Sequence, residues 1–210
     1  MNKNKKAVAI FNRYAKLYQD KFMDVNLYGD TFDYFCRAIK TKDADILEIA
    51  CGPGNITRYL LNQRPDFNLL GTDLAPQMLE LARINNPEAN FKKMDGRDIL
   101  TLNKKFDGLM CGFFLPYLSK VEVEKLFSDA SKILKPTGVI YISTMEDDYD
   151  KSGLRTGSTG EEMYMHYYEA KFLTSTLIQN KFKILKMERK ESFMTDGSKV
   201  CDVILIAAKL

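Results

Sequence analysis

The chain has 210 residues, a formal net charge of +3 and a hydrophobic share of 45%. This size fits a single domain, residues 1–210, that can bury a core without disulfides or metal. The composition excludes a fibrous protein, a disordered tail and a membrane bundle. The small positive charge is spread along the chain, so we expect no nucleic-acid partner. Four separated cysteines and one histidine predict free thiols and no metal site.

The first residues show no export signal. They are basic, and their apolar run is too short for the core of a signal peptide. No stretch approaches the roughly 20 apolar residues of a membrane span. We therefore expect a cytoplasmic protein that does not enter membranes.

From residue 45 onward, short apolar runs alternate with amphipathic stretches, which predicts strands alternating with helices. The expected strands are 45–50, 68–73, 90–95, 106–114, 138–145, 182–192 and 199–210. The expected helices are 57–63, 76–86, 121–136 and 168–180. This alternation predicts an α/β fold with a mostly parallel seven-stranded sheet covered by helices on both faces. A turn at Asp196-Gly197 joins the last two strands without a helix, so one strand near the C-terminus should be antiparallel.

Two segments fall outside this alternation. Residues 1–40 are rich in aromatic residues, and we expect a helical lid that becomes ordered when a ligand binds. Residues 146–167 are expected to be an irregular insertion beside the site, because long loops are often functional. The domain then consists of this lid, a core at 45–145, the insertion, and a C-terminal helix and hairpin at 168–210.

The segment ILEIACGPGNIT (46–57) carries the strongest functional signal. Glu48 lies inside the expected strand, and the small residues Ala50, Gly52 and Gly54 follow it. Residues this small allow a sharp turn and a close approach of the backbone to a ligand. The next helix presents free N–H groups there, and ligands of open α/β sheets bind at the carboxyl ends of the strands.

The residues around this turn favour a nucleoside with a cationic tail over a dinucleotide. Thr57 stands where a dinucleotide fingerprint needs a third small residue, and no Gly-Lys pair of a phosphate loop exists. Glu48 would repel a diphosphate but suit an amino group. Asp73 lies 19 residues after Gly54 and is placed to accept the hydroxyl groups of a ribose. S-adenosylmethionine fits this description.

The chain resembles the class I S-adenosylmethionine-dependent methyltransferases of the small-molecule type, similar to those of ubiquinone and menaquinone biosynthesis. ILEIACGPGNIT resembles the first family motif, although Ala50 replaces a glycine and Glu48 replaces an aspartate. Further matches are GTDLAPQMLELA (71–82), KMDGRDI (93–99), FDGLMCGFFLPYL (106–118) and LKPTGVIYIST (134–144). The resemblance implies a Rossmann-like three-layer sandwich with S-adenosylmethionine as cofactor and S-adenosylhomocysteine as product.

The resemblance also implies the residues of the cofactor site. Asp73 would bind the ribose and Asp95 the adenine amino group, and Tyr18 matches an AxxY pattern that begins at Ala15. The residues implied to bind the cofactor are Tyr18, Glu48, Ala50, Cys51, Gly52, Gly54, Asp73, Leu74, Met78, Asp95, Gly96, Cys111 and Phe113. The alternative for most of them is an ordinary role in a strand end, a turn or the core.

The fourth motif bears on the methyl acceptor. Cys111 to Phe114 lack the (N/D)PP(Y/F) tetrad of base and amide methylators, which favours a small-molecule acceptor. Candidates to bind it are Tyr14, Tyr117, Tyr164 and Tyr167, and candidates for catalysis are His166 and Tyr18. His166 alternatively lies at the surface or caps a helix.

We therefore expect transfer of a methyl group by in-line displacement, mainly through proximity and orientation. The alternatives are a non-catalytic S-adenosylmethionine-binding subunit and a nicotinamide oxidoreductase. The protein is expected to be a monomer or a homodimer.

Overall fold

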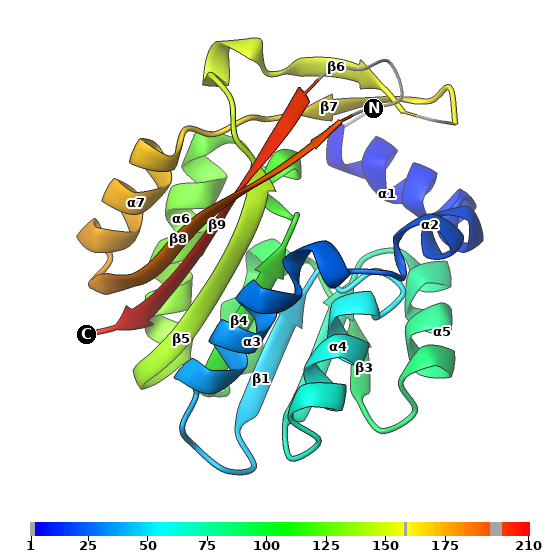
Figure 1. Ribbon diagram of the computed structural model, residues 1–210. Helices are drawn as coiled ribbons and strands as arrows, with labels where there is room; N and C mark the ends of the chain where they lie inside the picture. The colour runs from blue at the N-terminus through cyan, green and yellow to red at the C-terminus, as the bar shows by residue number, and fades with distance from the viewer. Residues whose placement is uncertain (1–2, 158, 194–198) are drawn as a thin grey trace.

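The computed structural model describes residues 3–157, 159–193 and 199–210, which form a three-layer α/β sandwich (Figure 1). Its seven-stranded sheet has the order β3-β2-β1-β4-β5-β9-β8. The strands are β1 (Asp45–Ile49), β2 (Asn68–Asp73), β3 (Asn90–Lys93), β4 (Phe106–Gly112), β5 (Leu134–Met145), β8 (Phe182–Phe193) and β9 (Lys199–Lys209). β9 pairs antiparallel with both β5 and β8, and the other neighbours pair in parallel. The predicted fold class and its reversed strand are confirmed.

Alternating side chains of the strands build two cores, one on each face of the sheet. Leu47 and Ile49 of β1 face one core, which α6 and α7 cover, and Ile46 faces the other, which α3 and α4 cover. The helices are α3 (Gly29–Ala38), α4 (Asn55–Gln63), α5 (Pro76–Asn85), α6 (Lys120–Ile133) and α7 (Ala170–Gln179). No helix in the described part of the chain is long and apolar enough to cross a bilayer.

The first 40 residues divide into two parts with different surroundings. Helices α1 (Lys3–Arg13) and α2 (Ala15–Phe22) pack against the start of α5 in a small cluster of their own. After the 3-10 turn η1 (Asn26–Tyr28), α3 packs on the sheet with Phe32 and Phe35 fully buried. Only α1 and α2 therefore have the position expected of a lid, whereas α3 is part of the core.

The insertion at 146–167 is not irregular, so this part of the prediction is wrong. It contains the turn η4 (Tyr149–Lys151) and an antiparallel hairpin of β6 (Gly153–Thr156) and β7 (Glu162–Met165). β6 has a single large apolar residue, Leu154, and this residue is exposed, so the segment lacks the apolar run of a buried strand. The hairpin lies beside α1 (Figure 1), and Arg13 forms an ion pair with Glu161 at 3.4 Å.

Several boundaries differ from those expected. The helix predicted for 121–136 ends at Ile133, because Leu134 already pairs with Phe106 as the first residue of β5. Two short helices were not expected, η2 (Gly96–Leu102) and η3 (Leu115–Tyr117). The predicted turn at Asp196-Gly197 lies outside the described residues.

Candidate functional site

A pocket opens at the carboxyl ends of β1, β2 and β4, where the sequence predicted a site. It holds about 860 Å³ of space, part of which is open to solvent. Helix α1 and Tyr18 of α2 form its outer wall. Its lining residues are Ala7, Val8, Phe11, Tyr18, Ala50, Gly52, Asp73, Leu74, Ala75, Met78, Met94, Asp95, Gly96, Arg97, Gly112, Phe113, Phe114, Tyr117 and Leu118.

The loop after β1 is a sharp turn in the left-handed backbone region. Ala50 has a φ of 53°, Gly52 a φ of 53° and Gly54 a φ of 77°. A Cβ atom on Gly54 would lie 2.3 Å from Nδ2 of Asn86, which donates a hydrogen bond to the Gly54 carbonyl at 3.0 Å. Glycine is therefore required at position 54 for close packing as well as for its dihedral angles.

Ala50 is strained, so we expect Ala50→Gly to stabilise the fold by up to about 1.6 kcal/mol. The left-handed region costs a non-glycine residue roughly 1–2 kcal/mol, and glycine removes this cost. The extra freedom of glycine stabilises the unfolded chain by about 0.4–1 kcal/mol, which offsets part of the gain. Ala75 has an ordinary φ of −86°, so Ala75→Gly is the control and should destabilise. Urea denaturation measures both, and destabilisation by Ala50→Gly would contradict the strain.

Asp73 is the acid that joins this loop to the end of β2. Its Oδ2 accepts a hydrogen bond from the N–H of Gly52 at 3.0 Å, and its Oδ1 accepts one from Ala75 at 2.8 Å. Burial raises the pKa of this carboxyl, while the backbone donors oppose that rise. Each oxygen retains a lone pair that can accept a further hydrogen bond from a ligand in the pocket.

Glu48 lies behind the loop and outside the pocket lining. It is 1% exposed, and its Oε2 accepts a hydrogen bond from the Thr57 hydroxyl at 2.5 Å. Burial raises the pKa of Glu48 to about 8, with a smaller contribution from the nearby charge of Asp73. Burial therefore favours the protonated carboxyl over the carboxylate. A charged Glu48 was expected from the sequence, which does not show the cost of burial.

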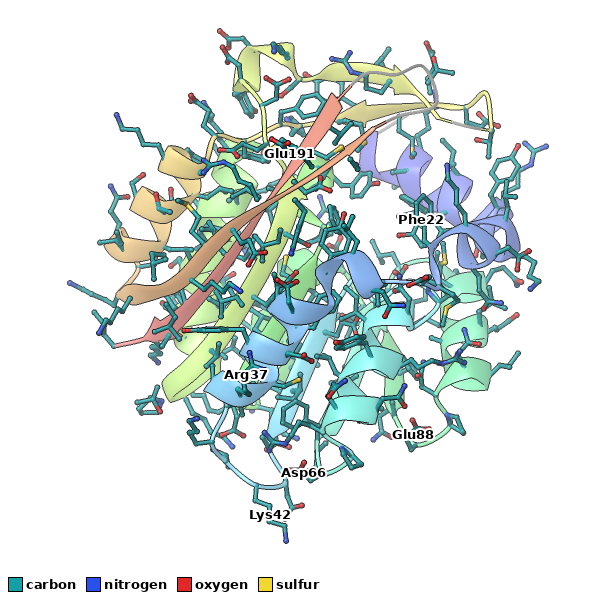
Figure 2. The ribbon with its side chains drawn as sticks, in the orientation of Figure 1. Phe22, Arg37, Lys42, Asp66, Glu88 and Glu191 are labelled. Carbon is teal, nitrogen blue, oxygen red and sulfur yellow. The ribbon has the colours of Figure 1, made fainter. Side chains whose placement is uncertain are left out.

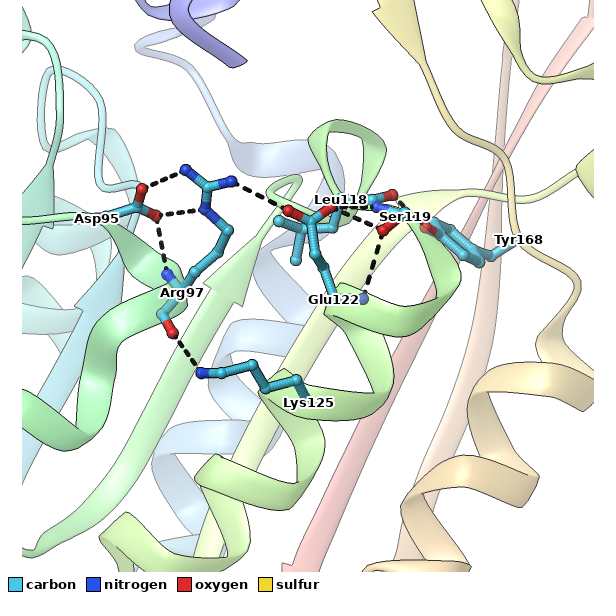
Figure 3. A network of polar contacts seen from close by, with 7 residues as sticks. All are labelled: Asp95, Arg97, Leu118, Ser119, Glu122, Lys125 and Tyr168. Atoms are coloured by element: carbon cyan, nitrogen blue, oxygen red, sulfur yellow. Dashed lines mark hydrogen bonds and ion pairs between the residues drawn. The ribbon is translucent and has the colours of Figure 1, made fainter. Parts of the chain in front are cut away.

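Asp95 lines the pocket beyond Asp73, at the start of η2. Its carboxylate is held by Arg97, which also lines the pocket and which sequence reasoning missed (Figure 3). The Arg97 side chain and backbone N–H bonds hold the pKa of Asp95 below its usual value despite partial burial. The ring of Phe114 packs closely on the backbone of Gly96. A Cβ atom on residue 96 would lie 2.8 Å from that ring, so the contact depends on glycine.

Aromatic side chains form the remaining wall. The ring of Phe11 packs edge-on against Tyr18 at 5.7 Å and against Tyr117 at 5.4 Å. Burial raises the pKa of Tyr18 to about 12, with a smaller effect from Asp73, so its hydroxyl stays protonated. Phe113 follows β4 with a φ of 52°, and its N–H donates to the Ser143 carbonyl at 3.0 Å.

A buried polar contact supports Phe113 from behind. The ring of Tyr28 packs edge-on against Phe113 at 5.3 Å, and its hydroxyl donates to Oδ2 of Asp202 at 2.7 Å. Asp202 is 4% exposed, and burial raises its pKa. This contact ties the N-terminal segment to β9 and keeps the aromatic wall in place.

The structure brings most of the predicted cofactor residues into one pocket. Those in the lining are Tyr18, Ala50, Gly52, Asp73, Leu74, Met78, Asp95, Gly96 and Phe113. Those outside the lining are Glu48, Cys51, Gly54 and Cys111. Cys51 and Cys111 are 2% and 1% exposed and belong to the interior. The lining residues that the sequence did not single out are Ala7, Val8, Phe11, Ala75, Met94, Arg97, Gly112, Phe114 and Leu118.

Of the predicted acceptor and catalytic residues, Tyr117 and Tyr18 line the pocket, and Tyr14, Tyr164, Tyr167 and His166 do not. His166 ends the hairpin segment, where its N–H donates to the Pro116 carbonyl at 2.8 Å. Its ring lies 4.8 Å from that of Tyr164. The hydroxyl of Tyr167 accepts from Nε of Arg155 at 3.2 Å. This group borders the loop that carries Tyr117.

Comparison with known proteins finds methyltransferases. Residues 46–138 match a family model described as a methyltransferase domain. A trans-aconitate 2-methyltransferase from Enterobacter sp. (strain 638) is 44% identical over 54 residues, 26% of this chain and 21% of that protein. A malonyl-[acyl-carrier protein] O-methyltransferase from Priestia megaterium is 25% identical over 203 residues, 86% of this chain and 72% of that protein. The chain covers only 36%, 21% and 35% of the length of three matching curated relatives.

The fold has a counterpart among solved structures. Magnesium protoporphyrin IX methyltransferase from Synechocystis PCC 6803, solved with bound S-adenosylmethionine, superposes with a TM-score of 0.74. The two sequences are 15% identical, and the match covers 100% of this chain and 98% of the other. At this identity the comparison establishes a shared fold.

Proposed function

We propose that this chain, which carries a methyltransferase domain in the class I fold, transfers a methyl group from S-adenosylmethionine to a small-molecule acceptor. The observation that carries the proposal is Asp73 at the end of β2, which lines the pocket and accepts a hydrogen bond from the N–H of Gly52. An acid in this position, beside a glycine turn, suits a ribose. The domain match over residues 46–138 supports the same assignment.

The lining residues suit the parts of the cofactor in order along the pocket. Asp73 binds the ribose hydroxyls, and Asp95 accepts a hydrogen bond from the adenine amino group. Met78 is 2% exposed and lies with Leu74 and Ala75 on the apolar surface against which the base packs. The methionine tail lies along Gly52 and Ala50, with its ammonium group on the pocket side of the loop that covers Glu48.

The aromatic wall of Phe11, Tyr18, Phe113 and Tyr117 receives the sulfonium end and the acceptor. Aromatic faces near a sulfonium contribute about 0.5–2 kcal/mol by cation–π attraction.

The leaving group is already activated by its charge, so the chain acts mainly by holding nucleophile and methyl carbon in line. During transfer the new bond to the methyl carbon forms as the carbon–sulfur bond breaks, and its electron pair remains on sulfur. A proton on the acceptor needs a base only where the acceptor is protonated at working pH.

The test is binding followed by turnover. We expect isothermal titration calorimetry to show binding of S-adenosylmethionine and S-adenosylhomocysteine, and mass spectrometry to show methylation within a panel of small acceptors. Absence of binding at millimolar concentration would overturn the proposal. Binding without turnover across a broad panel would support the non-catalytic alternative, and preferential binding of NADH would support an oxidoreductase.

Helices α1 and α2 should close over the bound cofactor as a lid. They have their own small cluster, and Phe22 at the end of α2 packs on Tyr18 at 4.7 Å while remaining 42% exposed (Figure 2). We expect their amides to exchange more slowly with S-adenosylhomocysteine bound, while amides of the buried α3 serve as the unchanged control. Equal exchange in α1 and α2 with and without ligand would contradict the lid.

A further inference from the structure

We propose that Arg97, held by Glu122, is the positioning residue that makes the site selective for a 6-amino purine. Arg97 itself does not bind the amino group in this proposal. It orients Asp95 so that one acceptor site of the carboxylate faces the base. The inference rests on the proposed function, because it assumes that the pocket binds an adenosine cofactor.

Arg97 occupies most of the hydrogen-bonding capacity of Asp95. Oδ1 of Asp95 accepts from the backbone N–H of Arg97 at 3.0 Å and from its Nε at 2.9 Å, and Oδ2 accepts from Nη2 at 2.5 Å. A carboxylate has about four acceptor sites, two on each oxygen. These three bonds leave one site, on Oδ2. Both residues line the pocket, so this site is the one available to a base bound there.

The guanidinium is held on its other side by α6. Nη1 of Arg97 donates to Oε1 of Glu122 at 3.0 Å (Figure 3). Glu122 also closes the capping box of this helix, where its Oε2 accepts from the N–H of Ser119 at 2.8 Å. Lys125 donates to the Arg97 carbonyl at 2.9 Å. Arg97 thus has a fixed orientation between η2 and the start of α6, and Asp95 is oriented with it.

This arrangement discriminates between purines by their 6-substituent. An ionised carboxylate accepts hydrogen bonds and donates none. The 6-amino group of adenine donates a hydrogen bond to the remaining site of Oδ2. The 6-oxo group of hypoxanthine presents an acceptor to the same oxygen and is repelled. A hydrogen bond to a charged group corresponds to a discrimination of roughly 10–100-fold.

The experiment compares Arg97→Lys with Arg64→Lys. Arg64 forms a similar two-pronged pair with Asp66, through Nε at 2.8 Å and Nη2 at 2.7 Å. Asp66 lies at the end of the molecule opposite the pocket (Figure 2), so this variant controls for loss of a bidentate pair away from the pocket. Calorimetry measures the affinities of S-adenosylhomocysteine and of its 6-oxo counterpart, S-inosylhomocysteine. Lysine cannot reproduce the two-pronged bond, which frees Asp95 to turn.

We expect the wild type and Arg64→Lys to prefer the 6-amino ligand by about 10–100-fold and Arg97→Lys to lose most of this ratio. Glu122→Gln should also lower the preference for the 6-amino ligand, by about threefold, which is roughly half of a tenfold effect on a logarithmic scale. This variant tests the network if Arg97→Lys does not fold. A wild-type ratio kept in folded Arg97→Lys or in Glu122→Gln would overturn the role of Arg97 and leave the proposed function standing. Failure of the wild type to bind either ligand would overturn both.

Discussion

Replacement of Asp73 with alanine should weaken the binding of S-adenosylhomocysteine by about 10²–10⁴-fold. Two ribose hydroxyls donating to the carboxylate contribute about 1.5–3 kcal/mol each, and each 1.4 kcal/mol corresponds to a factor of ten. The same change removes the bonds to the N–H groups of Gly52 and Ala75, which loosens the glycine loop that borders the pocket. Isothermal titration calorimetry measures the loss.

Two further variants separate the role of Asp73 from a general loss of stability. Asp73→Asn keeps the shape and one acceptor oxygen, so its affinity should lie between those of the wild type and the alanine variant. Asp66→Ala removes a carboxylate that accepts hydrogen bonds from three donors, but at the opposite end of the molecule (Figure 2). It should destabilise the fold without changing the affinity. Equal affinity of Asp73→Ala and wild type would contradict the assignment.

Glu48 should make the stability of the protein fall as the pH rises from about 4.5 to 8. Its pKa is raised to about 8 in the folded state by burial, against about 4.3 in an unfolded chain. Between these values the folded protein holds a proton that the unfolded chain has released, so a rising pH favours unfolding. The slope from this group approaches about 1.4 kcal/mol per pH unit. Glu48→Gln should remove it, because glutamine can still accept from Thr57.

Urea denaturation of both proteins at pH 5, 6, 7 and 8 isolates this contribution, since other titrating groups cancel in the difference. The stability gained by Glu48→Gln should increase steadily over this range. Binding gives a second readout at pH 7. If the ammonium group of the cofactor reaches Glu48, binding lowers its pKa and releases up to one proton, which calorimetry in buffers of different ionisation enthalpy detects. A pH-independent difference in stability would show that Glu48 is already ionised in the folded protein.

The alternation of apolar runs and amphipathic stretches was enough to predict the fold class, the seven strands of the main sheet and the reversed strand. Strand and helix periods are local properties of the chain, and a short connection between two final strands permits only an antiparallel pair. The hairpin of β6 and β7 was missed because the one large apolar residue of β6, Leu154, is exposed, so that strand shows no apolar run. The predicted end of α6 lay too far along the chain, because Leu134 pairs with Phe106 in the sheet and these two residues are distant in sequence.

The spacing of small and acidic residues by itself predicted where the pocket lies and that Ala50, Gly52 and Asp73 border it. Ala50, Gly52 and Asp73 meet there because the carboxyl ends of neighbouring parallel strands meet at one edge of a sheet. Only the tertiary structure decided the rest. It placed Phe11 of α1 in the lining of the pocket, joined Arg97 to Asp95 and Glu122, and buried Glu48, which raises the pKa of its carboxyl. Desolvation and contacts between distant segments are properties of the folded molecule, and no local pattern contains them.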